Sequence, residues 1–215
     1  MLRRFGFGAI SGSGFPGESP GVLPDYRRWG EVEKAALSYG YGLSVTPLQL
    51  ATAYAALANG GRMREPTFVK GGAKPEASVI DPSLAQTMLG MLETVTMPGG
   101  TSRLAAVPYY RVGGKSGTSR KAGGGGYQDR RYISLFAGIA PISAPRLACV
   151  VVINDPSGVA YYGGLVSAPV FGRVIGGALR LMDIPPDSPL LMEAAHSSSE
   201  DLDAAAEAVG EPITP

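Results

Sequence analysis

The apolar positions of this 215-residue chain follow a helical period in three stretches. The first opens with Thr46, Pro47 and Gln49, which provide an N-cap hydroxyl, a proline at the first helical position and a capping-box partner. It ends at the Asn-Gly-Gly of residues 59–61, where glycine favours a helix C-terminus. Apolar side chains lie on nearly every side of this segment, so we expect a buried helix.

Two further helices are predicted on the same grounds. One begins at Asp81-Pro82 and stops before Pro98, and Thr101 is placed to cap a short helix after it. The other covers residues 166–182 and should pack back on a sheet. The residues at helical spacing are Leu84, Met88, Met91 and Val95 in the first helix and Phe171, Val174, Ile175, Ala178 and Met182 in the second.

Three β-strands are predicted between these two helices. Residues 109–114 predict a strand that leads into residues 115–118, and apolar residues alternate from position 133 to 139. The β-branched run at 147–153 predicts a more fully buried neighbouring strand. Because the linker at 140–146 is short, we expect antiparallel hairpins. The element order therefore predicts an α+β fold, an antiparallel sheet packed with helices.

The two ends of the chain differ in composition from its middle. Residues 6–24 are rich in Gly, Ser and Pro without a period, which predicts an extended loop. We expect residues 1–186 to share one core and residues 187–215, which contain no Lys or Arg, to be an acidic, disordered tail. The formal charge of +1 hides this division, because Arg180 is the last basic residue and eight of the 18 carboxylates follow it.

Composition argues against several classes of protein. The longest apolar runs, 147–153 and 166–175, are too short to span a bilayer, and residues 1–8 lack the apolar segment of a secretory signal. The single cysteine, Cys149, lies in a β-branched run and is expected to be a small buried hydrophobe. The single histidine, His196, has no second soft ligand near it, so we expect no metal and no cofactor. No basic block interleaved with aromatic residues indicates nucleic-acid binding.

The chemically suggestive cluster is Lys-Ser-Gly-Thr at residues 115–118. A phosphate-binding loop that ended at Lys115 would need glycine at position 109, and Tyr109 stands there, so that template fails. The cluster also resembles the K-[ST]-G element of penicillin-recognising enzymes. On these residues alone, a basic surface turn remains the alternative interpretation.

The residue types of this cluster suit acyl transfer to a peptide. Lys115 would place a positive charge beside a reacting serine, and the hydroxyls of Ser116 and Thr118 would bind a substrate carboxylate. The backbone N–H of Thr118 could provide half of an oxyanion hole. Gly117 has no side chain, so a peptide could lie against the strand edge.

Longer segments resemble class B penicillin-binding proteins. Residues 38–61 (SYGYGLSVTPLQLATAYAALANGG) are very similar to the segment that precedes the K-[ST]-G strand in that family. Shorter pieces follow in the family's order: FPGE at 15–18 with GVLP at 21–24, GGT at 99–101 and YYGGLVSAPVF at 161–171. The last, ALRLMDIPPD at 178–187, resembles the septal transpeptidases in particular. Together these pieces cover about residues 5–187.

This resemblance implies a serine acyltransferase that cross-links peptidoglycan stem peptides ending in D-Ala-D-Ala during septum formation and is acylated by β-lactams. It implies the periplasmic face of the bacterial inner membrane and division-complex membrane proteins as partners. Lys115, Ser116, Gly117 and Thr118 would be the third active-site motif. Arg120 would assist carboxylate binding, and Tyr132, Tyr161 and Tyr162 would form the aromatic side of the cleft, although plain packing is an equal alternative for Tyr161.

The family's other two motifs, S-x-x-K and S-x-N, do not occur. No serine of the chain has Lys three positions later or Asn two positions later. We therefore expect a part of a larger D,D-transpeptidase that is inactive by itself because the nucleophile is elsewhere. The alternatives are a non-catalytic module that binds peptidoglycan or a division partner, and a serine β-lactamase-like hydrolase, in which the helix that begins at residues 45–50 would not be expected in this form.

Overall fold

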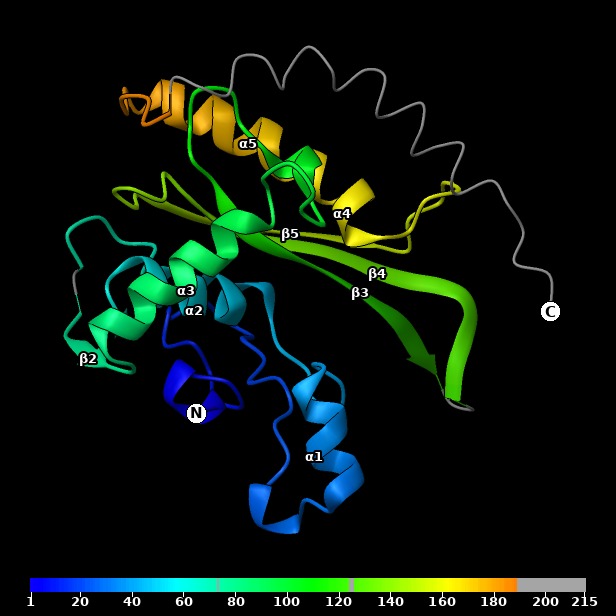
Figure 1. Ribbon diagram of the computed structural model, residues 1–215. Helices are drawn as coiled ribbons and strands as arrows, with labels where there is room; N and C mark the ends of the chain where they lie inside the picture. The colour runs from blue at the N-terminus through cyan, green and yellow to red at the C-terminus, as the bar shows by residue number, and fades with distance from the viewer. Residues whose placement is uncertain (73, 124–125, 189–215) are drawn as a thin grey trace. The chain divides into compact units, whose positions relative to one another are not determined.

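The computed structural model describes residues 1–72, 74–123 and 126–188 and divides into two compact units, Met1–Gln86 and a second that begins at Thr87 (Figure 1). The helices are α1 (Glu31–Ser38), α2 (Pro47–Ala58), α3 (Pro82–Thr94), α4 (Gly163–Val166) and α5 (Ala168–Leu181), with 3-10 helices η1 (Leu2–Phe5), η2 (Tyr26–Arg28) and η3 (Arg103–Ala105). The strands are β1 (Arg62–Arg64), β2 (Glu76–Ser78), β3 (Gly113–Gly123), β4 (Gly126–Ala140) and β5 (Leu147–Asn154).

The second unit is built on a three-stranded antiparallel sheet in the order β3-β4-β5. Its central strand, β4, pairs with β5 only from Ile133 onward, whereas it pairs with β3 along nearly the whole length of the hairpin. The far end of the β3–β4 hairpin therefore projects beyond β5 (Figure 1). The prediction of an α+β fold with antiparallel strands is confirmed.

Strand β3 begins later than predicted and runs further. Tyr109 has a φ of 69°, and the backbone N–H of Tyr110 donates to the carbonyl of Val107 at 3.1 Å, so this segment is a turn. The strand begins at Gly113 and continues through the Lys-Ser-Gly-Thr motif. The motif therefore lies within the strand and not only at its end.

The prediction that residues 147–153 form the more fully buried strand is wrong. Residues 136–140 of β4 are all buried, whereas β5 is an edge strand in which Val152 is 41% exposed. A β-branched run indicates a strand, but its place in the sheet depends on partners that are distant in sequence.

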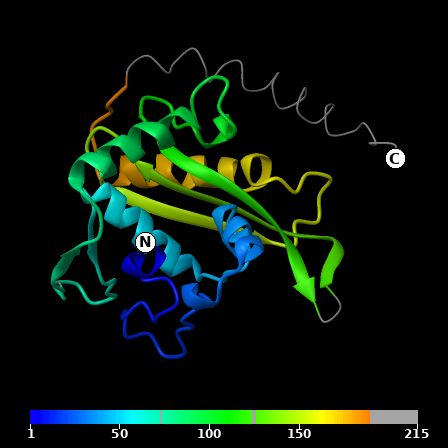
Figure 2. The same ribbon diagram turned by 60° about the horizontal axis from the view of Figure 1, so that its bottom comes forward.

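Helices α4 and α5 cover one face of this sheet (Figures 1 and 2). The buried ring of Phe171 on α5 lies 4.7 Å from that of Phe136 on β4. Gly138 makes this approach possible, because a Cβ there would lie 2.6 Å from the Phe171 ring. Cys149 packs against this core, as expected, and burial raises the pKa of its thiol.

The buried faces of two helices differ from the predicted ones. In α5 the buried stripe is Phe171, Ile175 and Leu179, and Val174 and Met182 are 51% and 47% exposed. In α3 the structure buries Ala85, Leu89 and Leu92 and leaves Leu84 and Met91 exposed. Both helices carry apolar residues on two faces, so spacing alone did not decide which face is inside.

Hydrogen bonds connect the segment after α5 to the residues just before β3. The hydroxyl of Tyr110 donates to the carbonyl of Ile184 at 2.7 Å, and the carboxylate of Asp187 accepts from the backbone N–H of Arg111 at 2.7 Å. Asp187, where the predicted tail begins, is thus bound to the second unit. Residues 189–215 of that tail, with His196, lie outside the described residues.

Among the described residues, Gly163–Leu181 is long and apolar enough to cross a membrane by length and composition. However, Phe171 and Leu179 are fully buried, and Phe171 packs on the sheet. These residues of the segment therefore contribute to the core of the second unit.

In the first unit, one buried glutamine organises the predicted N-terminal loop. Gln49 is 2% exposed, and its amide donates to the carbonyls of Ala9 at 2.7 Å and Pro20 at 2.9 Å. Its side-chain oxygen accepts from the backbone N–H of Thr46, whose hydroxyl accepts from the N–H of Gln49. The predicted capping box of α2 is therefore confirmed.

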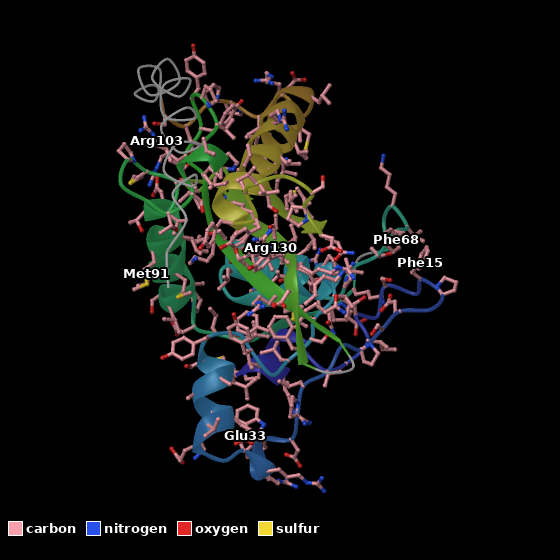
Figure 3. The ribbon with its side chains drawn as sticks, turned by 90° about the vertical axis from the view of Figure 1, so that its right-hand side faces the viewer. Phe15, Glu33, Phe68, Met91, Arg103 and Arg130 are labelled. Carbon is pink, nitrogen blue, oxygen red and sulfur yellow. The ribbon has the colours of Figure 1, made fainter. Side chains whose placement is uncertain are left out.

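A second polar group shapes the tip of the same loop. The carboxylate of Glu18 accepts from the hydroxyls of Ser13 and Ser11, and these bonds lower the pKa of Glu18 to about 2. The closed loop presents Phe15, whose exposed ring meets that of Phe68 edge-on at 5.9 Å (Figure 3).

Three features of the first unit differ from or add to the prediction. Helix α2 is only partly buried, since Gln49, Ala53 and Ala56 are its buried residues. Helix α1 has no buried residue and was not predicted. The β1–β2 pair was also missed, because each strand has only three residues. An ion pair of 2.9 Å between Arg62 and Glu76 links the two strands.

Candidate active site

The Lys-Ser-Gly-Thr motif occupies the first half of β3, at the edge of the sheet. On one side β3 pairs with β4, and within the described residues no strand pairs with its other edge. A free strand edge offers backbone N–H and C=O groups to an extended peptide. The first half of β3 therefore has one edge that no described strand covers.

The predicted site residues divide between the two faces of this strand. Ser116, Thr118 and Arg120 pair with β4 residues on the face covered by α4 and α5, opposite Phe136, Ser134 and Tyr132 respectively. Successive strand residues point to opposite faces, so Lys115 and Gly117 face the other way. The structure thus separates Lys115 from the remaining polar side chains of the predicted site.

Lys115 has few contacts of its own. Its side chain is exposed, and its ammonium donates to the carbonyl of Ser116 at 2.9 Å. Among the described residues, no carboxylate lies within ion-pair distance of it. The positive charge is therefore available to a group outside the described structure.

Thr118 is held from the helix side by α4. Its hydroxyl oxygen accepts from the backbone N–H of Gly163 at 3.0 Å. Gly163 lies so close to the sheet that a Cβ there would be 2.4 Å from the carbonyl oxygen of Leu135 and 2.5 Å from that of Gly117. Because the hydroxyl already accepts one bond, its proton remains free to donate to a substrate oxygen.

The three predicted tyrosines form one stack beside Thr118. The ring of Tyr161 lies 4.0 Å from Tyr132 at an interplanar angle of 12°, and 4.4 Å from Tyr162. The hydroxyl of Tyr161 donates to that of Tyr162 at 3.2 Å, and this bond is the main cause that raises the pKa of Tyr161 to about 12. The buried hydroxyl of Ser134 donates to the Tyr161 carbonyl and fixes the backbone there.

Charged residues brace the hairpin near this stack. Arg120 binds Asp129 at 3.0 Å across the hairpin. Asp155, just after β5, accepts from Arg131 at 2.6 Å and pairs with Lys121 at 3.5 Å. The hydrogen bond from Arg131 is the main reason that the pKa of Asp155 is lowered.

A pocket beside this region is lined by residues 155–160 with Ile153, Leu165 and Val166. None of the predicted site residues lines it. The predicted residues form an open strand edge and an aromatic stack, not an enclosed cavity.

Sequence reasoning missed three residues that hold this region. They are Gly163, Ser134 and Asp155, which contact Thr118, Tyr161 and the hairpin respectively. Gly163 follows the tyrosine pair in the segment at 161–171 that resembles the family, so the sequence marked this position. It did not show that Gly163 packs closely on β3. Ser134 lies in the strand predicted from alternating apolar residues, and its neighbours in sequence do not indicate that its hydroxyl bonds to the carbonyl of Tyr161.

An edge strand with a Lys-Ser-Gly-Thr motif, backed by helices on one face of an antiparallel sheet, defines a penicillin-recognising transpeptidase fold. The family model for the penicillin-binding protein transpeptidase domain matches residues 1–176. The chain therefore belongs to the penicillin-binding protein transpeptidase domain family, as its sequence motifs indicated.

Individual relatives agree with this assignment. The chain is 46% identical over 186 residues to the peptidoglycan D,D-transpeptidase FtsI of Escherichia coli K12, covering 86% of this chain and 32% of FtsI. It is 44% identical over 202 residues to the probable peptidoglycan D,D-transpeptidase PbpC of Pseudomonas aeruginosa, covering 91% of this chain and 36% of PbpC. The chain thus spans about a third of the length of these relatives.

A solved structure shares the fold. The apo structure of the transpeptidase domain of Burkholderia pseudomallei penicillin-binding protein 3 superposes with a TM-score of 0.81 at 42% identity. The match covers 87% of this chain and 58% of that one.

Proposed function

We propose that this chain supplies the K-[ST]-G side of a peptidoglycan D,D-transpeptidase active site. The substrate would be a stem peptide ending in D-Ala-D-Ala, and β-lactams would acylate the same centre. The observation that carries this proposal is the edge of β3 that no described strand covers, together with the Thr118 hydroxyl anchored by Gly163.

Gly117 and Thr118 of the motif then have defined parts. The peptide extends the sheet along β3, where Gly117 presents no side chain to obstruct it. Its terminal carboxylate is bound by the hydroxyl of Thr118, with Arg120 nearby on the same face. The backbone N–H of Thr118 stabilises the oxyanion. Tyr132, Tyr161 and Tyr162 form an apolar wall beside the peptide.

The nucleophilic serine would come from polypeptide outside these 215 residues. The support is that no S-x-x-K or S-x-N occurs in the sequence. Lys115, on the opposite face of β3 and without a carboxylate partner among the described residues, would face that serine and lower the cost of its anionic form. This chain alone would then form no acyl-enzyme.

Family membership and the named relatives support a role in cell division. We propose that the complete protein acts at the septum on the periplasmic face of the bacterial inner membrane. Its partners would be membrane proteins of the division complex.

Labelling with a fluorescent penicillin tests the proposal. A polypeptide that joins these residues to their S-x-x-K segment should be labelled at that serine, and the 215-residue chain alone should not. Covalent labelling within residues 1–215 would refute the assignment.

A substitution pair locates the site on β3. Thr118→Val in the joined polypeptide should slow acylation by about 10- to 100-fold, since a hydrogen bond to a charged group is lost. Thr94→Val is the matched control, because that exposed hydroxyl donates to the carbonyl of Met91 in its own helix and, among the described residues, lies outside the predicted site. Equal acylation rates for the two variants would remove Thr118 from the site.

A further inference from the structure

The regular pairing between β3 and β4 is interrupted just beyond the end of β5. After the pair formed by Arg120 and Tyr132 the register shifts, and Lys121 lies opposite residues 128–131. Arg130 lies in this interruption and has a φ of 55°, in the left-handed region that few residues other than glycine adopt (Figure 3). The regular ladder therefore stops at a pair of residues that both belong to the predicted site.

One carboxylate bridges the two strands at this interruption. Asp155, the first residue after β5, accepts from the guanidinium of Arg131 on β4 at 2.6 Å and from the ammonium of Lys121 on β3 at 3.5 Å. Its backbone N–H donates to the carbonyl of Tyr132 at 2.8 Å. Asp155 thus joins the end of β5 to both strands of the hairpin where the ladder between them is broken.

The loop that begins at Asp155 returns to the same part of β4 at its other end. There the ring of Tyr161 stacks on that of Tyr132 at 4.0 Å, and the carbonyl of Tyr161 accepts from the hydroxyl of Ser134. Both ends of residues 155–161 are therefore attached beside Tyr132. Movement of Asp155 would displace the start of this loop as well as the hairpin.

We propose that Asp155 is a positioning residue for the cleft, which holds Arg120 and Tyr132 in place by bridging Lys121 and Arg131. Strand β5 supports β4 only from Ile133 onward, so the outer part of the hairpin depends on other contacts for its direction. The carboxylate restrains the hairpin, because it is carried by the end of β5 and binds a cation on each strand. The effect on acylation rests on the proposed function, whereas the restraint on the hairpin does not.

Hydrogen exchange tests the restraint on the hairpin. Asp155 has a φ of 60°, which glycine adopts readily, so Asp155→Gly removes the carboxylate without straining the backbone. In the polypeptide joined to its S-x-x-K segment, amides at 119–121 and 130–133 should exchange about 2- to 5-fold faster, as expected for the loss of a partly exposed ion pair. Amides at 135–139 should be unchanged. Wild-type exchange throughout the hairpin of Asp155→Gly would overturn the proposal.

A matched control and a second variant keep this test specific. Asp183→Gly makes the same change at an exposed aspartate with a φ of 51°, after α5, and should leave exchange in the hairpin unchanged. Arg131→Gln removes the guanidinium that donates to Asp155 and should speed exchange at the same amides as Asp155→Gly. Faster exchange in Asp183→Gly, or none in Arg131→Gln, would mean that the bridge is not what restrains the hairpin.

Penicillin acylation of the same joined polypeptide tests the consequence for the cleft. Asp155→Gly should raise the dissociation constant of the non-covalent complex about 2- to 5-fold and leave the acylation rate at saturation within about twofold, because Lys115 and the serine are not touched. Asp155→Asn keeps an acceptor oxygen and should recover part of the affinity. An unchanged dissociation constant in Asp155→Gly, with normal labelling of the wild type, would overturn the positioning role alone. No labelling of the joined wild type would instead refute the proposed function, and the exchange result would still decide the restraint.

Discussion

A substitution at Gly163 tests the contact between α4 and β3 most directly. Alanine at an unobstructed helical position stabilises a protein by about 0.5–1 kcal/mol relative to glycine. At Gly163 the added methyl would lie 2.4 Å from the Leu135 oxygen and 2.5 Å from the Gly117 oxygen. Both are backbone atoms of a sheet, so α4 must move instead.

The magnitude follows from two costs. Overpacking a well-filled contact costs about 1–3 kcal/mol. Loss of the 3.0 Å bond from Gly163 to Thr118 adds about 0.5–1.5 kcal/mol. After the gain from helix propensity is subtracted, we expect Gly163→Ala to lower the free energy of unfolding by about 0.5–4 kcal/mol.

The matched control is Gly177→Ala. Gly177 lies in α5, and a Cβ there has nothing within 4 Å. This variant should therefore be more stable than the wild type, whereas Gly163→Ala should be less stable, when both are unfolded in urea. If the two variants change stability equally, the close packing of α4 on β3 is not what holds Gly163 in place.

Three further predictions concern the core, an ion pair and pH. Phe171→Ala should cost about 3–5 kcal/mol in urea unfolding, and the exposed Val174→Ala less than about 1 kcal/mol; similar losses would mean that α5 is turned differently. Arg111→Ala should lower the free energy of unfolding by about 2 kcal/mol, because Glu93, which is 7% exposed, loses its hydrogen bonds of 2.6 and 2.7 Å to Arg111. The cost is at the low end for a buried pair because the Arg111 side chain is 42% exposed. A double-mutant cycle with Glu93→Ala that shows no coupling would contradict this. The pKa of Glu18 is lowered from 4.5 to about 2, so its contribution to stability is complete above pH 4.5 and is lost as pH falls towards 2. Glu18→Gln should remove that part of the pH dependence, and an unchanged profile would argue against the Ser13 and Ser11 bonds.

Local signals in the sequence predicted the fold well where the determining residues are neighbours. The capping box of Thr46 and Gln49 gave the start of α2, and Pro82 gave the start of α3. Short linkers gave the antiparallel pairing of β4 with β5. In each case the physical cause lies within a few residues of the feature, so it can be seen in one sequence.

Predictions failed where a distant partner decides the outcome. Both Leu84 and Leu89 lie at apolar positions of α3, and only the tertiary contact selects Leu89 for burial. For the short helix after α3, the sequence suggested Thr101 as the cap, but Ser102 takes that place without capping. The division of the motif between two faces follows from strand alternation, but only the structure shows which face of β3 the helices α4 and α5 cover.

That division bears on how the motif works. If residues 115–118 had formed a turn after a strand, Lys115 and Thr118 could have converged on one ligand atom. Within a strand they point to opposite faces, so one group cannot replace the other. Thr118 is fixed by Gly163 on the helix-covered face, whereas Lys115 presents an exposed charge on the face without α4 and α5. Under the proposed function, a substitution of Lys115 should slow acylation and leave the Gly163–Thr118 contact intact. Thr118→Val should slow acylation and also remove that contact, so hydrogen exchange at Gly163 tells the two variants apart.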